Sequence, residues 1–157
     1  MIQRIQTLYL LLVTILIVVC MSNCIGYFIS DDGVMSGKLF NLLYLDMEDG
    51  NKAVSLYTPW ALFVILLIAA TLSFLNIFMF KYRALQMRIC SFCMILLVGW
   101  YAVYAAFAWY ISDILKSASF RVGIMASLPG VCLILLYLAF RGIMKDEKLV
   151  RSLDRLR

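Results

Sequence analysis

Cysteines are the residues of this chain whose spacing comes closest to a known chemistry. Cys90 and Cys93 form a Cys-x-x-Cys pair, and Cys20 and Cys24 lie four residues apart near the end of an apolar stretch. Paired thiols can carry disulfide exchange when their pKa values and surroundings allow it. However, Cys90 and Cys93 directly follow a basic turn that we expect on the cytoplasmic side, where thiols stay reduced. Buried apolar packing is therefore the preferred interpretation of all five cysteines.

Other residue types that carry chemistry are missing from the predicted membrane spans. The chain has no histidine, the commonest general base and metal ligand. No carboxylate lies inside a predicted span, which counts against transporters, proton pumps and intramembrane proteases. No Gly-rich phosphate loop, nucleophile elbow or zinc-type cysteine spacing occurs. We expect no catalytic residue, no cofactor, no metal and no small-molecule substrate.

Five acidic residues between positions 31 and 49 are the one further cluster of oxygen ligands. They could bind calcium weakly, but a solvated loop explains them more simply. They are Asp31, Asp32, Asp46, Glu48 and Asp49.

The elements that must position these residues follow from composition. Of 157 residues, 65% are hydrophobic and 15% are charged, whereas soluble domains carry about 25% charged residues. A bilayer core of about 30 Å needs about 20 helical residues per crossing. Four stretches meet or nearly meet this length without a charge, at residues 8–29, 58–80, 89–111 and 122–140. The predicted fold class is an all-α integral membrane protein, a single domain built as a bundle of four transmembrane helices.

The first apolar stretch could also be read as part of a signal peptide. A lipoprotein-type cleavage before Cys20 prefers small residues where Val18 and Val19 stand, and the apolar run continues to Phe28. We therefore predict a retained first helix. The most polar residues within the spans are Asn23 and Asn76, and we expect them to form interhelical hydrogen bonds.

The distribution of basic residues predicts the topology. Ten of the 14 Lys and Arg residues fall on one side of a four-span arrangement, which the positive-inside rule assigns to the cytoplasm. Both termini and a short turn at residues 81–88 are then cytoplasmic. The uneven distribution also explains the net charge of +5 without a nucleic-acid partner. The ten are Arg4, Lys81, Arg83, Arg88, Arg141, Lys145, Lys148, Arg151, Arg155 and Arg157, and the remaining four are Lys38, Lys52, Lys116 and Arg121.

Two connections lie on the opposite, outer side. In residues 30–57, turn signals bracket Lys38–Asp46 and Lys52–Tyr57, whose composition suits short strands, so we expect a hairpin or three-stranded cap. The second connection, residues 112–121, is a short turn that makes the third and fourth helices antiparallel neighbours. Pro129 can kink the fourth helix, and the preferred interpretation is a tolerated membrane-helix proline without a gating role.

Residues 141–157 predict an amphipathic helix that continues or restarts in the cytoplasm. Leu149, Leu153 and Leu156 share one face, and Glu147 and Arg151 form a favourable i, i+4 pair. The mixed charge favours a protein partner over anionic lipid alone. We predict that a partner binds residues of this tail together with two residues of the turn at 81–88. The predicted partner-binding residues are Arg83 and Arg88 in the turn, and Lys145, Asp146, Glu147, Leu149, Arg151, Leu153 and Arg155 in the tail.

Three segments, MIQRIQ at the start, LQMRIC after the central turn and RGIMKDEKLVRSLDRLR at the end, resemble one family. It comprises small four-span inner-membrane proteins of Bacteroidota that are grouped as a domain of unknown function. The resemblance implies the inner membrane of a diderm bacterium and supplies no activity. The layout also looks like claudin-type tetraspans, in architecture only, because residues 30–57 lack their paired loop cysteines.

The first functional hypothesis is a non-enzymatic inner-membrane accessory subunit or scaffold. Its basic cytoplasmic face and tail would bind a larger membrane protein complex, and the bilayer would surround its spans. A second is a membrane thiol oxidoreductase related to four-span quinone-coupled enzymes, using Cys20 with Cys24 or Cys90 with Cys93. A third is a small-molecule permease, which would need a continuous polar cavity between the helices.

Overall fold

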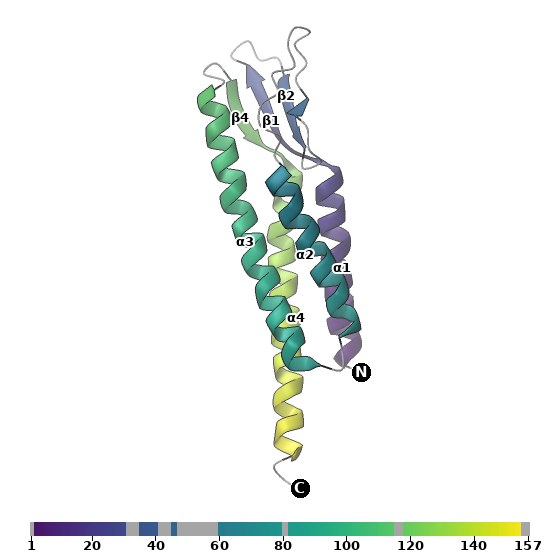
Figure 1. The fold of residues 1–157 in the computed structure, drawn as a ribbon. Helices are drawn as coiled ribbons and strands as arrows, with labels where there is room; N and C mark the ends of the chain where they lie inside the picture. Colours follow the sequence, from purple (N-terminus) through teal and green to yellow (C-terminus); the bar gives the residue numbers. More distant parts are fainter. Residues whose placement is uncertain are drawn as a thin grey trace.

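The computed structural model describes residues 2–30, 35–40, 45–46, 60–79, 82–114 and 118–154. Within these ranges four long helices run side by side (Figure 1): α1 (Ile2–Ser22), α2 (Trp60–Phe78), α3 (Arg83–Ile114) and α4 (Leu128–Asp154). A 3₁₀ turn, η1 (Ile124–Ser127), leads into α4. Each of α1 and α3 packs against both α2 and α4, so the helices form a ring in chain order.

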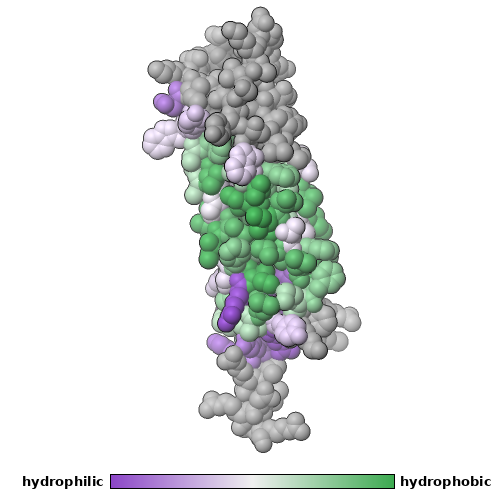
Figure 2. Space-filling view, viewed as in Figure 1, coloured by the Kyte–Doolittle hydropathy of each residue, from purple (hydrophilic) through white to green (hydrophobic). Residues whose placement is uncertain are grey.

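The surface of the bundle is apolar along most of its length. In α1, Leu10, Val13 and Ile17 are fully buried, while apolar neighbours such as Leu8 and Ile15 are exposed. The same holds for the other helices, and Figure 2 shows a continuous hydrophobic belt around the visible face. A soluble helix would carry polar residues on its exposed face. The described residues therefore include four helices that are long and apolar enough to cross a membrane.

A four-stranded antiparallel sheet covers one end of the bundle (Figure 1). Its strands are β1 (Cys24–Ser30), β2 (Met35–Phe40), β3 (Leu45–Asp46) and β4 (Ala118–Val122), in the order β3-β2-β1-β4. β1 is central, and Tyr27 is opposite Lys38 of β2 on one side and Arg121 of β4 on the other. We call this end of the molecule the sheet end, and the opposite end, where α2 ends and α3 begins, the helical end.

Two strands of the sheet, β1 and β4, lie outside the segments that were predicted to form the cap. The predicted run Lys38–Asp46 does contribute to β2 and β3, whereas Lys52–Tyr57 lies outside the described residues. Residues 24–29, predicted as the end of the first helix, instead form β1. Residues 118–121, predicted as part of a plain turn, belong to β4. A short apolar run suits a strand as well as a helix, and pairing on both sides supplies β1 with the backbone hydrogen bonds that a helix would otherwise provide.

Helix bounds also differ from the predicted spans at the helical end. The predicted turn 81–88 is mostly helix, because α3 already begins at Arg83, and Ala84, Leu85 and Gln86 are good helix formers. Two backbone hydrogen bonds stabilise the connection between α2 and α3. They run from Tyr82 N to Met79 O and from Gln86 N to Tyr82 O, and both are 3.0 Å long. The tail does not restart, because α4 is one helix to Asp154.

Pro129 produces no kink in the middle of the fourth helix. It is the second residue of α4, directly after η1. At this position its missing N–H would lack an intrahelical partner in any case. The span predicted at 122–140 therefore begins with the end of a strand and a 3₁₀ turn, and the regular helix starts at Leu128.

The junction between sheet and bundle is centred on the backbone carbonyl of Ile25. It accepts hydrogen bonds from the Tyr104 hydroxyl at 2.8 Å and from the Gly123 amide at 2.9 Å. The Tyr104 ring stacks on Trp100, with centroids 5.2 Å apart, and meets Phe120 edge-on. These contacts join α3, β1 and the segment before α4, so the sheet is fixed to the core of the bundle.

Candidate functional site

The partner-binding residues predicted from the sequence gather at the helical end. Arg88 and Lys145 are exposed, as is half of the Leu149 side chain, whereas Arg83 and Glu147 are half-buried. Arg151 and Leu153 lie in the last turns of α4, where the structure describes the backbone and not the side chains, and Arg155 lies outside the described residues. The structure thus brings α3 and α4 residues of the predicted set to one end.

Asp146 has a different environment from the one expected of a free docking residue. Its carboxylate oxygen Oδ2 accepts a hydrogen bond from Gln6 Nε2 at 2.6 Å, and its backbone carbonyl accepts one from Arg83 Nη1 at 3.5 Å. Gln6 is only 7% exposed. Gly142 lies against it, because a Cβ on Gly142 would approach the Gln6 side chain to 3.3 Å. Asp146 and Arg83 therefore connect α1, α3 and α4, and we name Gln6, Arg83 and Asp146 the three-helix latch.

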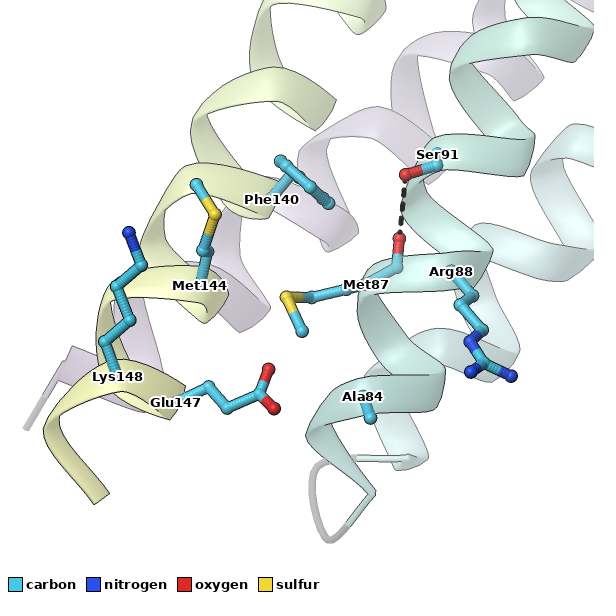
Figure 3. A pocket seen from close by; sticks show the side chains of 8 residues that line it. All are labelled: Ala84, Met87, Arg88, Ser91, Phe140, Met144, Glu147 and Lys148. Atoms are coloured by element: carbon cyan, nitrogen blue, oxygen red, sulfur yellow. Dashed lines mark hydrogen bonds between the residues drawn. The ribbon is translucent and has the colours of Figure 1, made fainter. Parts of the chain in front are cut away.

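A groove lies beside the latch, between α3 and α4 (Figure 3). Its volume is about 480 Å³. Met87 reaches across it from α3 toward α4, Met144 extends along α4 on the opposite wall, and Phe140 lies at its inner end. Ser91 directs its hydroxyl to the Met87 carbonyl at 3.2 Å, so this hydroxyl is satisfied by its own helix.

Charged side chains surround only the outer end of this groove. Glu147 extends from α4 toward α3 and Ala84, while Lys148 and Arg88 lie on the two outer flanks (Figure 3). The lining thus changes from apolar at Phe140 to charged at Glu147 over two turns of α4. We call this surface the α3–α4 groove.

A buried polar cluster joins α2 to α3 just inside the helical end. The side-chain amide Nδ2 of Asn76 lies 3.4 Å from the backbone carbonyl oxygen of Gln86 and 3.2 Å from Cys90 Sγ. In return, the side-chain Nε2 of Gln86 donates to the backbone carbonyl of Asn76 at 3.3 Å. Both amide side chains are buried. The expected interhelical role of Asn76 is confirmed. Asn23 instead directly follows α1, and its Nδ2 donates back to the Val19 carbonyl in that helix. This reciprocal pair fixes the end of α2 against the start of α3.

No two of the five cysteines form a disulfide bond, and most of the five lie in packed surroundings. Cys20, Cys90, Cys93 and Cys132 are buried. Cys93 Sγ accepts a contact from Ser73 Oγ at 3.8 Å, and Cys132 Sγ contacts Val13 O at the same distance. Cys20 lies in α1 but Cys24 begins β1, so the two residues do not share a helix face. These thiols lack the exposed, electropositive setting that activates a nucleophilic cysteine.

A second groove, between α1 and α2, is almost entirely apolar. It has a volume of about 440 Å³ and is lined by Val18, Phe63, Leu67 and neighbouring residues. The hydroxyls of Thr14 and Thr71 on its wall donate to the carbonyls of Leu10 and Ile68. Its wall therefore offers few polar groups, and it is a less specific surface than the α3–α4 groove. Within the described part of the chain, no three His, Cys, Asp or Glu side chains come together to hold a metal.

Gln6 and Gln86 are the residues at this end that sequence reasoning missed. Each occupies a buried stripe that is otherwise apolar: Gln6 precedes Leu10 and Val13 in α1, and Gln86 precedes Cys90 and Cys93 in α3. A polar residue that continues a buried apolar stripe at helical spacing was the available signal. Such a residue needs a partner, although the sequence does not say which one.

Comparison with known proteins places the chain in a family without assigning it a function. A family model described as "Domain of unknown function (DUF4293)" matches residues 2–156, nearly the whole chain. No curated protein matches.

Proposed function

Because the chain belongs to this family of unknown function, DUF4293, we propose a function from its geometry: it is a non-enzymatic membrane subunit or scaffold that binds a larger membrane protein complex through its helical end. The observation that carries the proposal is the length of α4. This helix continues from Phe140 to Asp154, a further distance of about 21 Å, and Figure 1 shows it projecting beyond the other helices. A rigid, charged helix beyond an apolar bundle is a surface suited to a partner.

The latch supports this proposal because it fixes the direction of the projecting helix. Asp146 is bonded to α1 through Gln6 and to α3 through its own carbonyl. A helix held at its base loses less conformational entropy on binding than a flexible tail would. The exposed residues around that base, Lys145, Lys148 and Leu149, then form the proposed docking surface.

The proposed location is the inner membrane of a bacterium of the Bacteroidota, with both termini in the cytoplasm. Seven basic residues of the described chain lie at the helical end, while two, Lys38 in β2 and Arg121 in β4, lie at the sheet end, and this distribution supports the orientation. The seven are Arg4, Arg83, Arg88, Arg141, Lys145, Lys148 and Arg151.

Of the two alternatives, the thiol oxidoreductase draws no support from the cysteines, because four of the five are buried and no two of them form a disulfide bond. The permease hypothesis requires a continuous polar cavity between the helices. The two grooves described above do not support it, because both lie on the outside of the bundle between adjacent helices. We therefore retain the docking function alone.

The proposal is tested by site-specific photo-cross-linking in native membranes. A cross-linking amino acid at Lys145 should capture one discrete polypeptide, and the same amino acid at Arg121, an exposed position at the sheet end, serves as the matched control. Capture from Arg121 alone, or only of diffuse products from both positions, would overturn the proposal.

Orientation is tested on the same two positions. Both variants also carry Cys24→Ser, because Cys24 lies partly exposed at the sheet end. In cells whose outer membrane is permeabilised, a membrane-impermeant maleimide should label Arg121→Cys and should leave Lys145→Cys unlabelled until the inner membrane is lysed. The reverse labelling would contradict a cytoplasmic helical end.

A further inference from the structure

We propose that the α3–α4 groove binds a phospholipid with a primary ammonium head group, a phosphatidylethanolamine-type lipid, with the ammonium at Glu147 and the proximal acyl chain over Met87, Met144 and Phe140. This inference rests on the membrane insertion in the proposed function and names a ligand that is separate from the protein partner. It begins from the change in polarity along the groove, which matches the change along a lipid molecule.

The inner part of the groove has the chemistry of an acyl-chain site. Met87 from α3 and Met144 from α4 line its two walls, and Phe140 lies one turn further in (Figure 3). Methionine is flexible and polarizable, so it adapts to an irregular apolar ligand. Among the described residues that line the groove, Ser91 carries the single hydroxyl, and it donates to its own helix. The remaining wall is suited to methylene groups.

The outer part lies where a head group would be. Glu147 follows Phe140 by seven residues, or about 10 Å along a helix. The head-group layers add about 5–8 Å on each side of a hydrocarbon core of about 30 Å. When Phe140 lies about one helical turn, or about 5 Å, inside the edge of the hydrocarbon, Glu147 lies about 5 Å beyond that edge and therefore at the depth of the head groups.

The charges at this level are complementary to a zwitterionic head group. The carboxylate of Glu147 projects between the helices, while the cations of Arg88 and Lys148 lie on the flanks (Figure 3). A carboxylate has about four lone-pair sites, so it can accept a hydrogen bond from a lipid ammonium in addition to contacts within the chain. The lipid phosphate is then beside the flanking cations.

This arrangement discriminates between lipid classes. A quaternary choline cannot donate a hydrogen bond to Glu147, and an anionic glycerol head group would bring its charge close to that carboxylate. An ethanolamine head group satisfies both sets of charges, because its primary ammonium donates to the carboxylate and its phosphate accepts from the adjacent cations. We therefore expect the preference ethanolamine over choline and over glycerol.

The test is native mass spectrometry of the purified full chain in mild detergent, with ethanolamine, choline and glycerol phospholipids of identical acyl chains added in equal amounts. One ethanolamine lipid should be retained preferentially. Glu147→Gln should lower its retention about three- to tenfold, as expected for the loss of a partly exposed charged hydrogen bond. Met144→Trp should abolish retention by filling the groove.

Lys145→Gln is the matched control, because Lys145 is exposed on the same turn of α4 and does not line the groove. It should retain the lipid like the unmodified chain. Since Met144→Trp could disturb folding, its thermal unfolding is compared with that of Glu147→Gln, which keeps the side-chain shape.

Equal retention of the three lipids, a preference for the glycerol head group, or retention unaffected by both groove variants would overturn this inference. So would a polypeptide cross-linked from Met144 in native membranes. A lost lipid preference with an intact partner cross-link from Lys145 would leave the proposed docking function standing, so the two proposals fail separately.

Discussion

The hydroxyl of Tyr104 in α3 donates a 2.8 Å hydrogen bond to the carbonyl of Ile25 in β1, across 79 positions of sequence. The same carbonyl also accepts from the Gly123 amide. One backbone oxygen thus connects the third helix, the central strand and the entry to the fourth helix. The sheet is therefore stabilised by contacts with the helix bundle in addition to the hydrogen bonds between its own strands.

We expect Tyr104→Phe to lower the free energy of unfolding by about 0.5–1.5 kcal/mol, the usual net contribution of one hydrogen bond. The ring and its stacking on Trp100 are retained, so only the hydroxyl is tested. Thermal or denaturant unfolding in detergent micelles measures the change. Tyr110→Phe, at an exposed position of the same helix, should be neutral, and an equal loss in both variants would contradict the special role of Tyr104.

Gly123 should not tolerate a side chain. A Cβ at this position would lie 2.8 Å from the Ile25 carbonyl carbon and 2.9 Å from its oxygen. These are backbone atoms that other hydrogen bonds hold in place, so we expect Gly123→Ala to destabilise the protein by about 1–3 kcal/mol. Gly99→Ala is the control, because a Cβ there meets no atom within 4 Å. If the two substitutions cost the same in unfolding experiments, the close approach of Gly123 to Ile25 is wrong.

The latch predicts different results for two substitutions of Asp146. Asp146→Ala leaves the buried Gln6 amide without its acceptor and should cost about 1–3 kcal/mol. Asp146→Asn keeps an oxygen acceptor of the same shape, so we expect it to cost less than half as much. Both are measured by unfolding in micelles beside Lys145→Ala, which should be neutral because Lys145 is exposed. Equal effects of Ala and Asn at position 146 would show that the hydrogen bond to Gln6 is not what stabilises the site.

Cysteine accessibility follows from burial. In the folded protein, a maleimide should react slowly and first at Cys24, the only cysteine of the five that is not fully buried. After denaturation without a reductant, all five should react, which mass spectrometry counts directly. A missing pair of labels that appears only after reduction would reveal a disulfide and would restore the oxidoreductase hypothesis.

Much of the architecture could be predicted from local pattern. Apolar length was sufficient to find four helices, because each apolar stretch is long enough to be recognised without its neighbours. The end of the first helix was not predictable in this way. Residues 24–30 form a strand because β4, about 90 residues later in the chain, pairs with them. The sequence around residues 24–30 does not indicate this pairing.

The helical end shows the same division between local and distant information. The exposed cations of α3 and α4 were found from charge distribution and helix periodicity. The role of Asp146 was not, because its partner Gln6 lies 140 positions away. A carboxylate on an amphipathic tail looks like a solvated docking residue until the start of α1 is placed beside it.

The central claim is that the helical end binds a protein partner, and its most direct measurement is co-purification from native membranes in mild detergent. The full chain is compared with a chain that ends after Lys148, which keeps the Gln6–Asp146 bond and removes the end of α4, and with Arg121→Glu as a control at the sheet end. We expect a stoichiometric partner that is retained by the full chain and by Arg121→Glu and is lost on truncation. The same partner-free profile for all three proteins would contradict it.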